Sequence, residues 1–117
     1  MEAIDLMKIA VKGADDKKAH NIRVLDIKEL TTLADYFVIC HGTSSTQMSA
    51  VFDEIEEKLK DEGVFMHNAG SQGSDQRMLM DYGDVIVHIF NEESREFYGI
   101  ENLWADAVNV DITEYIS

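Results

Sequence analysis

Two stretches of the chain carry apolar residues at helical spacing. The first, residues 2–19, follows the i, i+3, i+7 repeat of one helix face with Ile4, Met7, Val11 and Ala14. The second, which follows Ser44, repeats in the same way with Met48, Val51, Phe52, Ile55 and Leu59. Both stretches predict amphipathic helices that bury one side.

The second helix also has end signals. Ser44 with Gln47 three residues later matches a capping box, in which each residue satisfies a backbone donor at the helix start. Lys58 and Lys60 lie in the last turn, where cations suit the helix dipole. Gly63 is a ready C-terminal stop. The predicted helix therefore ends before Gly63.

Short β-branched and aromatic runs predict the strands. These runs are residues 22–28, 36–41, 64–67, 78–80 and 85–90. The last run is apolar on both faces apart from His88, and such a strand belongs in the middle of a sheet, under helices. Residues 81–84 predict a tight turn before it, and the glycines and serines of residues 68–76 predict a loop.

The order of elements predicts the fold class. A short helix is expected over residues 91–98, so the order is helix, two strands, helix, three strands, helix. This order is typical of a single α/β (α+β) domain with a mixed, five-stranded sheet flanked by helices. The pattern fades from Ala105, so we expect a domain over residues 1–106 and a loosely held C-terminal tail, 107–117.

Length and composition bound the class of protein. The 117 residues, 45% of them hydrophobic, fit one globular domain. The longest apolar runs are far too short for a membrane span, and no secretory signal is recognisable, so no membrane contact is expected. The one cysteine, Cys40, lies in an apolar run and is expected to be a small buried hydrophobe. A cytoplasmic location fits best.

The charge balance narrows the class of partner. The chain has 10 basic and 23 acidic residues, for a formal net charge of -13. Because nucleic-acid binding needs cations that displace condensed counterions, little direct contact with RNA or DNA is expected. A basic protein would be attracted to this surface. Acidity that serves only solubility is the alternative.

The turn at Gly42-Thr43-Ser44 is a candidate phosphate site, because it leaves a strand and opens a helix. It has no P-loop lysine, and helix capping needs the same small hydroxyl residues. A nucleotidyl-transfer site would also need two carboxylates that share metal ions. Asp81 and Asp84 are three residues apart across a turn, which does not fit that geometry.

The other candidate sites, for metal binding and for nucleophilic catalysis, have weaker support. His41, His67 and His88 lack the close spacing of metal ligands, so no metal and no cofactor is expected. His88 is expected to be a hydrogen-bonded core histidine. Neither a nucleophile elbow nor a reactive cysteine is present, so no catalytic residue is assigned.

Apolar and aromatic residues set among acids favour recognition of another protein. The set comprises Met78, Leu79, Met80, Tyr82, Phe97, Tyr98 and Trp104. Part of it must belong to the core, and Leu79 and Trp104 are expected there.

Five blocks of the sequence together resemble the ribosomal silencing factor family, also called Iojap-like proteins. In order, they are residues 34–39 (ADYFVI), 42–47 (GTSSTQ), 81–90 (DYGDVIVHIF), Arg95 with Tyr98, and Leu103-Trp104. The resemblance implies a mixed-sheet domain related to nucleotidyltransferases but without their catalytic residues. It also implies a translational repressor that binds the large ribosomal subunit through its protein fourteen. Such factors block joining of the small subunit and lower translation when nutrients are scarce.

The resemblance further implies a contact surface on the strand before the Asp-Tyr-Gly-Asp turn and on the turn itself. Its residues here are Arg77, Met78, Leu79, Asp81, Tyr82 and Asp84, with His88 behind them. Many family members have Trp at the position of Arg77, and Met78 or Met80 is expected to compensate. Two alternatives stay open: a nucleotide-binding or nucleotidyl-transferring enzyme that uses Gly42-Thr43-Ser44, and self-association as a homodimer.

Overall fold

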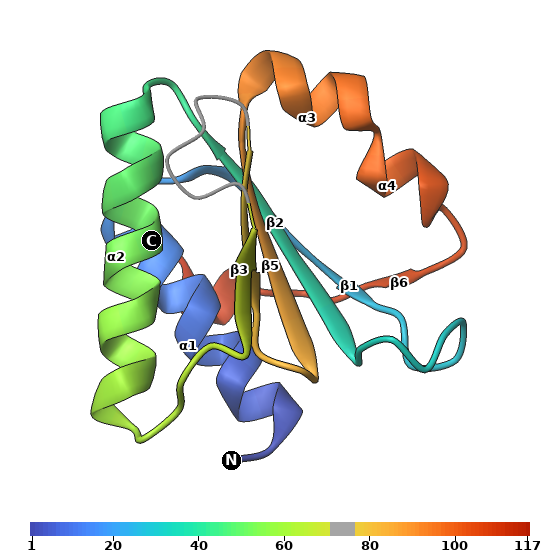
Figure 1. Ribbon diagram of the computed structural model, residues 1–117. Coiled ribbons are helices and arrows are strands. Elements are labelled where there is room, and N and C mark those ends of the chain that lie inside the picture. Colours follow the sequence, from blue (N-terminus) through green and yellow to red (C-terminus); the bar gives the residue numbers. More distant parts are fainter. Residues whose placement is uncertain (71–76) are drawn as a thin grey trace.

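A mixed sheet of six strands separates two layers of helices (Figure 1). The computed structural model describes residues 1–70 and 77–117. The helices α1 and α2 lie on one side of the sheet, and the shorter α3 and α4 lie on the other (Figure 1). The elements are α1 Ala3–Asp16, β1 His20–Asp26, β2 Tyr36–Gly42, α2 Ser45–Asp61, β3 Asn68–Gly70, β4 Arg77–Asp81, β5 Val85–Asn91, α3 Glu92–Tyr98, α4 Ile100–Leu103, β6 Val108–Asn109 and a 3₁₀ turn at Thr113–Tyr115.

The sheet is built around one parallel pair. The strand order is β3-β4-β5-β2-β1-β6, in which β2 and β5 run parallel and every other neighbour is antiparallel. The pair β2–β5 is in register from Tyr36 opposite Val85 to Gly42 opposite Asn91. Parallel strands need a long crossover, and α2 provides part of it. Residues between Asp81 and Val85 close the β4–β5 hairpin.

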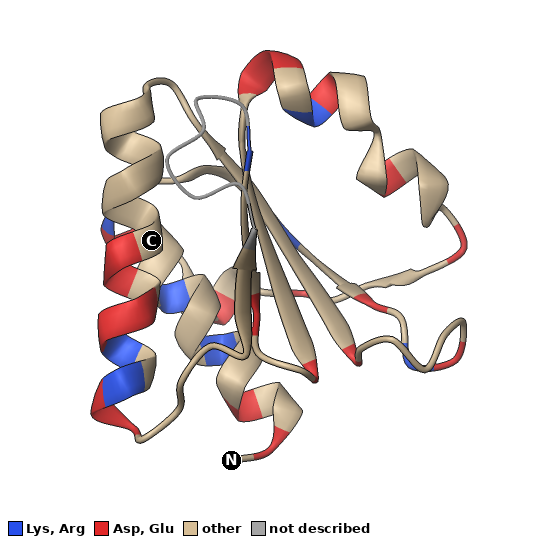
Figure 2. Ribbon diagram, viewed as in Figure 1, with Lys and Arg blue, Asp and Glu red and all other residues tan. Residues whose placement is uncertain are grey.

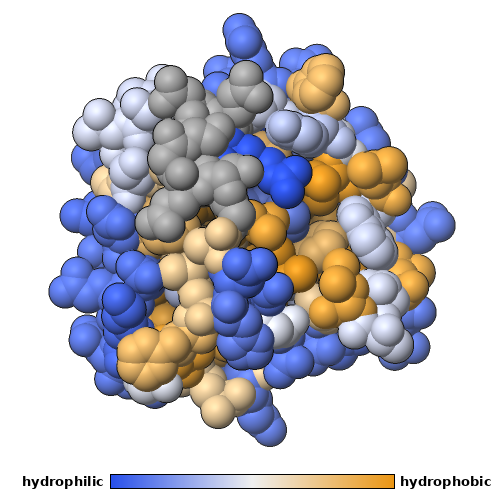
Figure 3. All heavy atoms as spheres, viewed as in Figure 1, coloured by the Kyte–Doolittle hydropathy of each residue, from blue (hydrophilic) through white to orange (hydrophobic). Residues whose placement is uncertain are grey.

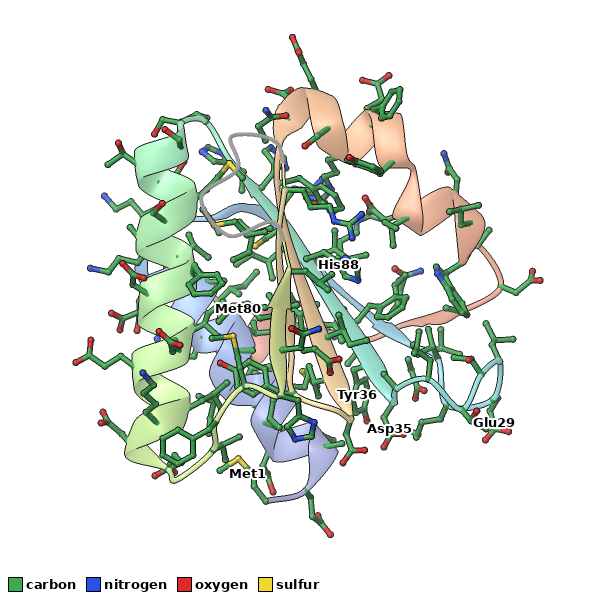
Figure 4. All side chains as sticks on the ribbon, viewed as in Figure 1. Met1, Glu29, Asp35, Tyr36, Met80 and His88 are labelled. Atoms are coloured by element: carbon green, nitrogen blue, oxygen red, sulfur yellow. The ribbon has the colours of Figure 1, made fainter. Side chains whose placement is uncertain are left out.

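Alternation along the strands gives the sheet two unlike faces. On the α1–α2 face, Met78 and Met80 of β4 join Val85, Val87 and Ile89 of β5 in the larger hydrophobic cluster. On the α3–α4 face, a smaller cluster contains Leu25, Ile27, Ala34, Phe37, Ile39, Ile86, Phe90 and Ala107. Figure 4 shows Met80 directed toward α2 and His88 toward the side of α3 and α4. The second cluster is only partly covered, since Leu79, Tyr98, Ile100 and Trp104 around it are half-buried.

The two long helices pack closely against each other. A Cβ built on Gly13 of α1 would lie 3.1 Å from Ile55 Cγ1 and 3.2 Å from Ile55 Cα of α2. A larger residue at position 13 would therefore push the helices apart. Ile55 itself is fully buried. This close approach explains why a glycine is tolerated inside α1 despite its helix-weakening entropy.

The start of α2 is capped, although not as a full capping box. Ser44 Oγ accepts from the Gln47 backbone N–H at 3.1 Å, as predicted. Gln47 Oε1 instead accepts from the backbone N–H of Thr43 at 2.8 Å. The amide nitrogen of Gln47 donates to the carbonyls of Lys17 and Lys18, at 3.3 and 2.9 Å. The side chain therefore ties the start of α2 to the end of α1.

The predicted single α/β domain with a mixed sheet is confirmed, with six strands in place of five. The predicted strand at residues 64–67 is displaced to β3, residues 68–70, which pairs with the end of β4. The remainder of the predicted loop, residues 71–76, lies outside the described residues. No helix in the ranges 1–70 and 77–117 is long and apolar enough to cross a membrane.

Two local expectations are wrong. Ile4 is exposed, because the buried face of α1 runs through Leu6, Met7, Ala10, Val11 and Ala14. The chain after Ala105 is not loosely held. Its short strand β6 pairs with Leu25 and Asp26 of β1, and Ile112 enters the larger cluster. Strand pairing of only two residues leaves no periodic pattern to detect in the sequence.

Candidate functional site

Strand alternation divides the predicted contact residues between the two faces of the sheet. Met78 and Tyr82 are 2% and 4% exposed and pack in the cluster under α1 and α2. Met80 is fully buried there as well. Neither methionine can therefore compensate at a surface for the aromatic residue that Arg77 replaces, and that expectation is wrong. Arg77, Leu79 and Asp81 are half-buried at the alternate positions of β4.

The alternate positions of β4 continue into a surface that includes Tyr98 of α3 and Trp104, which follows α4. We call it the open patch and define it by Arg77, Leu79, Asp81, Tyr98 and Trp104, with His88 beneath. Leu79 pairs with His88 and Arg77 pairs with Phe90 across the β4–β5 ladder. The Tyr98 ring lies 5.8 Å from that of Phe90, and the Trp104 ring packs edge-on against Phe37 at 5.3 Å. Leu79 and Trp104 are thus half-buried at the patch, not in the core as expected.

His88 lies between aromatic rings under the open patch. Its ring is 4.9 Å from Phe37, edge-on, and 6.0 Å from Phe90, nearly parallel. The side chain is 6% exposed, and neither ring nitrogen has a hydrogen-bond partner among the residues that the structure describes. Burial, with a smaller contribution from the charge of Arg77, lowers the pKa of His88 to about 4. The expectation of a hydrogen-bonded core histidine is therefore wrong, and His88 is neutral at neutral pH.

Arg77 lies next to His88 on the same face. Its guanidinium carbon is 5.1 Å from the centre of the Tyr98 ring, a cation–π contact. The Nε atom of Arg77 is buried without a hydrogen-bond partner in the described part of the chain. Arg77 and His88 therefore place three buried, unpaired nitrogen atoms on one side of the sheet.

A polar clamp that the sequence analysis did not single out holds α3 and α4 against the sheet. Arg95, 8% exposed, donates from Nε to Glu101 Oε1 at 2.8 Å and from an Nη atom to Oε2 at 3.2 Å. Its other Nη atom donates to His41 Nδ1 at 2.9 Å and to the His20 carbonyl at 3.4 Å. One guanidinium thus joins β1, β2, α3 and α4.

The electrostatics of the clamp follow from this geometry. Because arginine can only donate, His41 Nδ1 must accept, so the imidazole is neutral. Burial, then the charges of Arg95 and His20, lowers the pKa of His41. The hydrogen bonds from Arg95 lower the pKa of Glu101. A signal was present in the sequence, since Arg95 belongs to a motif block, but spacing alone could not identify its partners.

Exposed apolar side chains gather on the α3–α4 side of the molecule (Figure 3). Phe97 is 83% and Leu103 75% exposed. Acidic side chains are spread over the same helices and the adjoining loops (Figure 2). Of the predicted set of apolar residues among acids, Phe97 is exposed whereas Met78, Met80 and Tyr82 are buried. Leu103, which was not in that set, is exposed on the same side.

The Asp-Tyr-Gly-Asp turn lies at one end of the sheet. Asp81 Oδ1 accepts from the Gly83 N–H at 2.7 Å, and Gly83 has the positive φ of 84° that favours glycine. The Asp84 carbonyl accepts from the backbone N–H groups of Asp35 and Tyr36 at 2.7 and 3.1 Å, while the Asp84 side chain is exposed. The Tyr82 hydroxyl is buried without a described partner, and burial raises the pKa of Tyr82.

The parts of the alternative enzyme site do not meet. Gly42 pairs with Asn91 at one end of the β2–β5 pair, whereas Asp84 precedes Val85 at the other end. A strand of this length puts about 20 Å between the two ends, at ~3.3 Å per residue. Ser44 and Thr43 are engaged in capping α2. Within the described ranges, no group of three or more His, Cys, Asp or Glu residues is placed to hold a metal ion.

Cys40 has the environment that the sequence predicted. The side chain is fully buried in the larger cluster. Burial raises the pKa of the Cys40 thiol to about 12. Because the thiolate is the reactive form, this cysteine is inert at neutral pH.

Comparison with known proteins identifies the family. The whole chain, residues 1–117, matches the family described as "Ribosomal silencing factor during starvation". It is 37% identical to ribosomal silencing factor RsfS of Bacillus subtilis, over 96% of this chain and 95% of that protein. It is 30% identical to the chloroplastic protein Iojap of Zea mays, over 95% of this chain and 48% of that protein.

The fold agrees with this assignment. A crystal structure of a protein from Chromobacterium violaceum superimposes with a TM-score of 0.87 at 33% identity, covering 90% of this chain and 88% of that chain. The matched family and the Bacillus subtilis relative are named as silencing factors and not as enzymes. The sequence blocks, the fold and the full-length match agree, and the chain belongs to the ribosomal silencing factor family.

Proposed function

We propose that this protein binds the large ribosomal subunit through its protein fourteen and blocks association with the small subunit. In this role it lowers translation under nutrient limitation, in the cytoplasm, without chemistry and without a cofactor. The observation that carries the proposal is the open patch, an incompletely covered face of the sheet with apolar and aromatic side chains at its border. Large exposed apolar surfaces rimmed by polar residues mark protein–protein interfaces.

Charge supports a basic protein as the partner. The net charge of -13 favours a cationic surface and disfavours direct contact with the RNA around it. Ribosomal proteins beside rRNA present such cationic surfaces. Complementary charge also speeds the encounter and makes it dependent on salt.

The size of the protein suits a steric mechanism. Its principal extents are 34 × 33 × 29 Å. A rigid body of this size on the surface where the subunits meet would keep them apart without altering any covalent bond. The well-packed core under α1 and α2 gives the rigidity that such a spacer needs.

The predicted contact residues take different roles in this proposal. Arg77, Leu79 and Asp81 face the partner, and Asp84 contributes an exposed charge at the end of the sheet. Met78 and Tyr82 contribute indirectly, since their buried side chains hold β4 and the turn in position. His88 lies under the patch.

Sedimentation with isolated ribosomal particles tests the proposal. The protein is expected to migrate with large subunits and not with small subunits or joined ribosomes, and to reduce joining of purified subunits at saturating concentration. Reversal of Asp84 to Lys should weaken binding, with the exposed Asp53→Lys on α2 as a matched control. If joining is unaffected although the protein saturates its sites, the steric mechanism is wrong.

A further inference from the structure

Arg77 is an unusual cation for this surface. The chain has ten basic residues, and Lys12, Arg23, Lys28, Lys58 and Lys60 form ion pairs at its surface. Within the described ranges, Arg77 has no ion pair, and its only contact of note is with the face of the Tyr98 ring. A guanidinium is costly to hold half-buried among apolar side chains without a carboxylate.

The unpaired polar atoms of Arg77 and His88 also indicate that a binding group is missing. Arg77 Nε, His88 Nδ1 and His88 Nε2 are all buried and lack partners in the described structure. Buried polar atoms in folded proteins are nearly always hydrogen-bonded, because an unsatisfied one costs free energy. Two of these three atoms, Arg77 Nε and the protonated nitrogen of neutral His88, are donors, so a bound acceptor group could satisfy both.

The charges around Arg77 suggest the kind of group. Asp81 lies on the same face of β4, and α3 carries the exposed acids Glu92, Glu93 and Glu96. Arg77 is thus the cation of the open patch, with Asp81 on its own strand and exposed acids on α3, the helix that carries Tyr98. The complementary partner surface has a carboxylate at its centre and bases around it.

We propose that Arg77 and neutral His88 form an anchor site for one carboxylate side chain, an Asp or Glu of the docked protein, whose neighbours are basic. The guanidinium fork matches a carboxylate in geometry, and an imidazole N–H can donate one further hydrogen bond. The guanidinium contacts the face of the Tyr98 ring, and His88 pairs with Leu79 on the neighbouring strand, so both side chains lie on the same face of the sheet. This inference rests on the proposed function and names the group that the patch recognises.

Two variants remove the anchor without removing volume. Arg77→Met and His88→Leu are each expected to weaken co-sedimentation with large subunits by about 10-fold, the effect of losing a charge-assisted hydrogen bond at an interface. Arg77→Lys, which keeps the charge but not the fork, should bind with intermediate affinity. The exposed Lys17→Met, which removes a charge at the far end of α1, is the control and should bind as wild type.

The melting temperature of the free variant distinguishes a role of His88 in binding from a role in stability. His88→Leu is expected to keep or raise the melting temperature of the free protein, because it replaces two unsatisfied nitrogens with an apolar group. If His88→Leu lowers the melting temperature markedly, or if both variants bind like wild type, the inference is wrong.

A measurement without ribosomes keeps this test distinct from the test of the proposed function. Acetate serves as the carboxylate probe, and NMR follows the Arg77 Nε–H signal and the His88 ring signals during the titration. Saturable shifts that both variants abolish are expected. Absence of shifts at these two residues overturns the inference even if the protein binds large subunits, whereas shifts without ribosome binding would overturn only the proposed function.

Discussion

The two faces of the sheet are formed by the same strands, but they differ in helix cover, in the size of the apolar cluster and in hydrogen bonding. Under α1 and α2, long helices cover the sheet and bury a large apolar cluster, with contacts as close as Gly13 against Ile55. On the other side, α3 and α4 are short, the cluster is smaller, and one buried arginine holds the helices in place. Unpaired nitrogens and half-buried side chains remain at its border.

The difference shows how a small domain can combine stability with recognition. Burial of apolar area dominates folding free energy, so the closed face supplies most of the stability. The open face buries less apolar area. Its polar atoms stay unsatisfied on the side where a bound partner can supply hydrogen bonds to them. The predictions below test this division of roles, from the largest expected effect to the smallest.

Truncation on the closed face should destabilise much more than truncation on the open patch. Ile55→Ala is expected to cost about 4 kcal/mol of unfolding free energy, because it leaves a cavity in a rigid, fully buried site. Leu79→Ala, at a half-buried site, should cost about 1 kcal/mol and mainly weaken binding to large subunits. Urea denaturation measures both costs, and equal values would contradict the proposed division.

Loss of the clamp should destabilise by an intermediate amount. Arg95→Ala is expected to cost about 3 kcal/mol, because it leaves the partly buried Glu101 with only its 3.5 Å contact to Arg23 and frees α3 and α4 from the sheet. A double-mutant cycle of Arg95→Ala with Glu101→Gln should show a coupling of ~1–3 kcal/mol. Additive costs for the two changes would show that the contact is not a clamp.

Acid should destabilise the protein partly through His88. Its pKa is about 4 in the folded state, below the ordinary value of 6.5, so the unfolded chain binds the proton more readily. The contribution of His88 is complete above pH 6.5 and is lost as the pH falls toward 4, by up to ~1 kcal/mol per pH unit. Urea denaturation of the wild type and of His88→Leu across this range should give a steeper decline for the wild type. Parallel curves would mean that His88 is not buried in its neutral form.

The helix cap should have the smallest effect. Ser44→Ala is expected to cost ~1 kcal/mol, because it removes the acceptor for the Gln47 N–H at the start of α2. Binding to large subunits should not change, since the cap belongs to α2, on the opposite side of the sheet from α3 and α4. A change in binding would show that the start of α2 also belongs to the contact surface.

Local signals predicted the elements of the closed face well. The repeats in α1 and α2, the cap at Ser44 and the stop at Gly63 depend on neighbours in sequence. The run from Val85 to Phe90 likewise predicted the central strand, because a strand apolar on both faces needs a cover on each side. The exception on this side is Ile4, which has helical spacing but is exposed.

The open face was predicted less well, since its features depend on contacts between distant residues. Arg95 is 54 positions from His41, and their 2.9 Å contact has no trace in local spacing. The strand β6 has two exposed residues and pairs with β1, which is far away in the sequence. Met78, Tyr82 and Arg77 belong to one predicted surface in the sequence, and the pleat of β4 and the turn separated them.

The sequence by itself determined the family, the single α/β domain, the central strand with His88 and the acidic charge, because periodicity, composition and motif blocks are properties of the chain alone. Only the tertiary structure decided which side of the sheet each residue faces, how Arg95 joins four elements, and that Arg77 and His88 keep buried nitrogens unpaired. The physical reason is that burial and hydrogen bonding are decided between residues far apart in the chain, which meet only when the strands and helices pack.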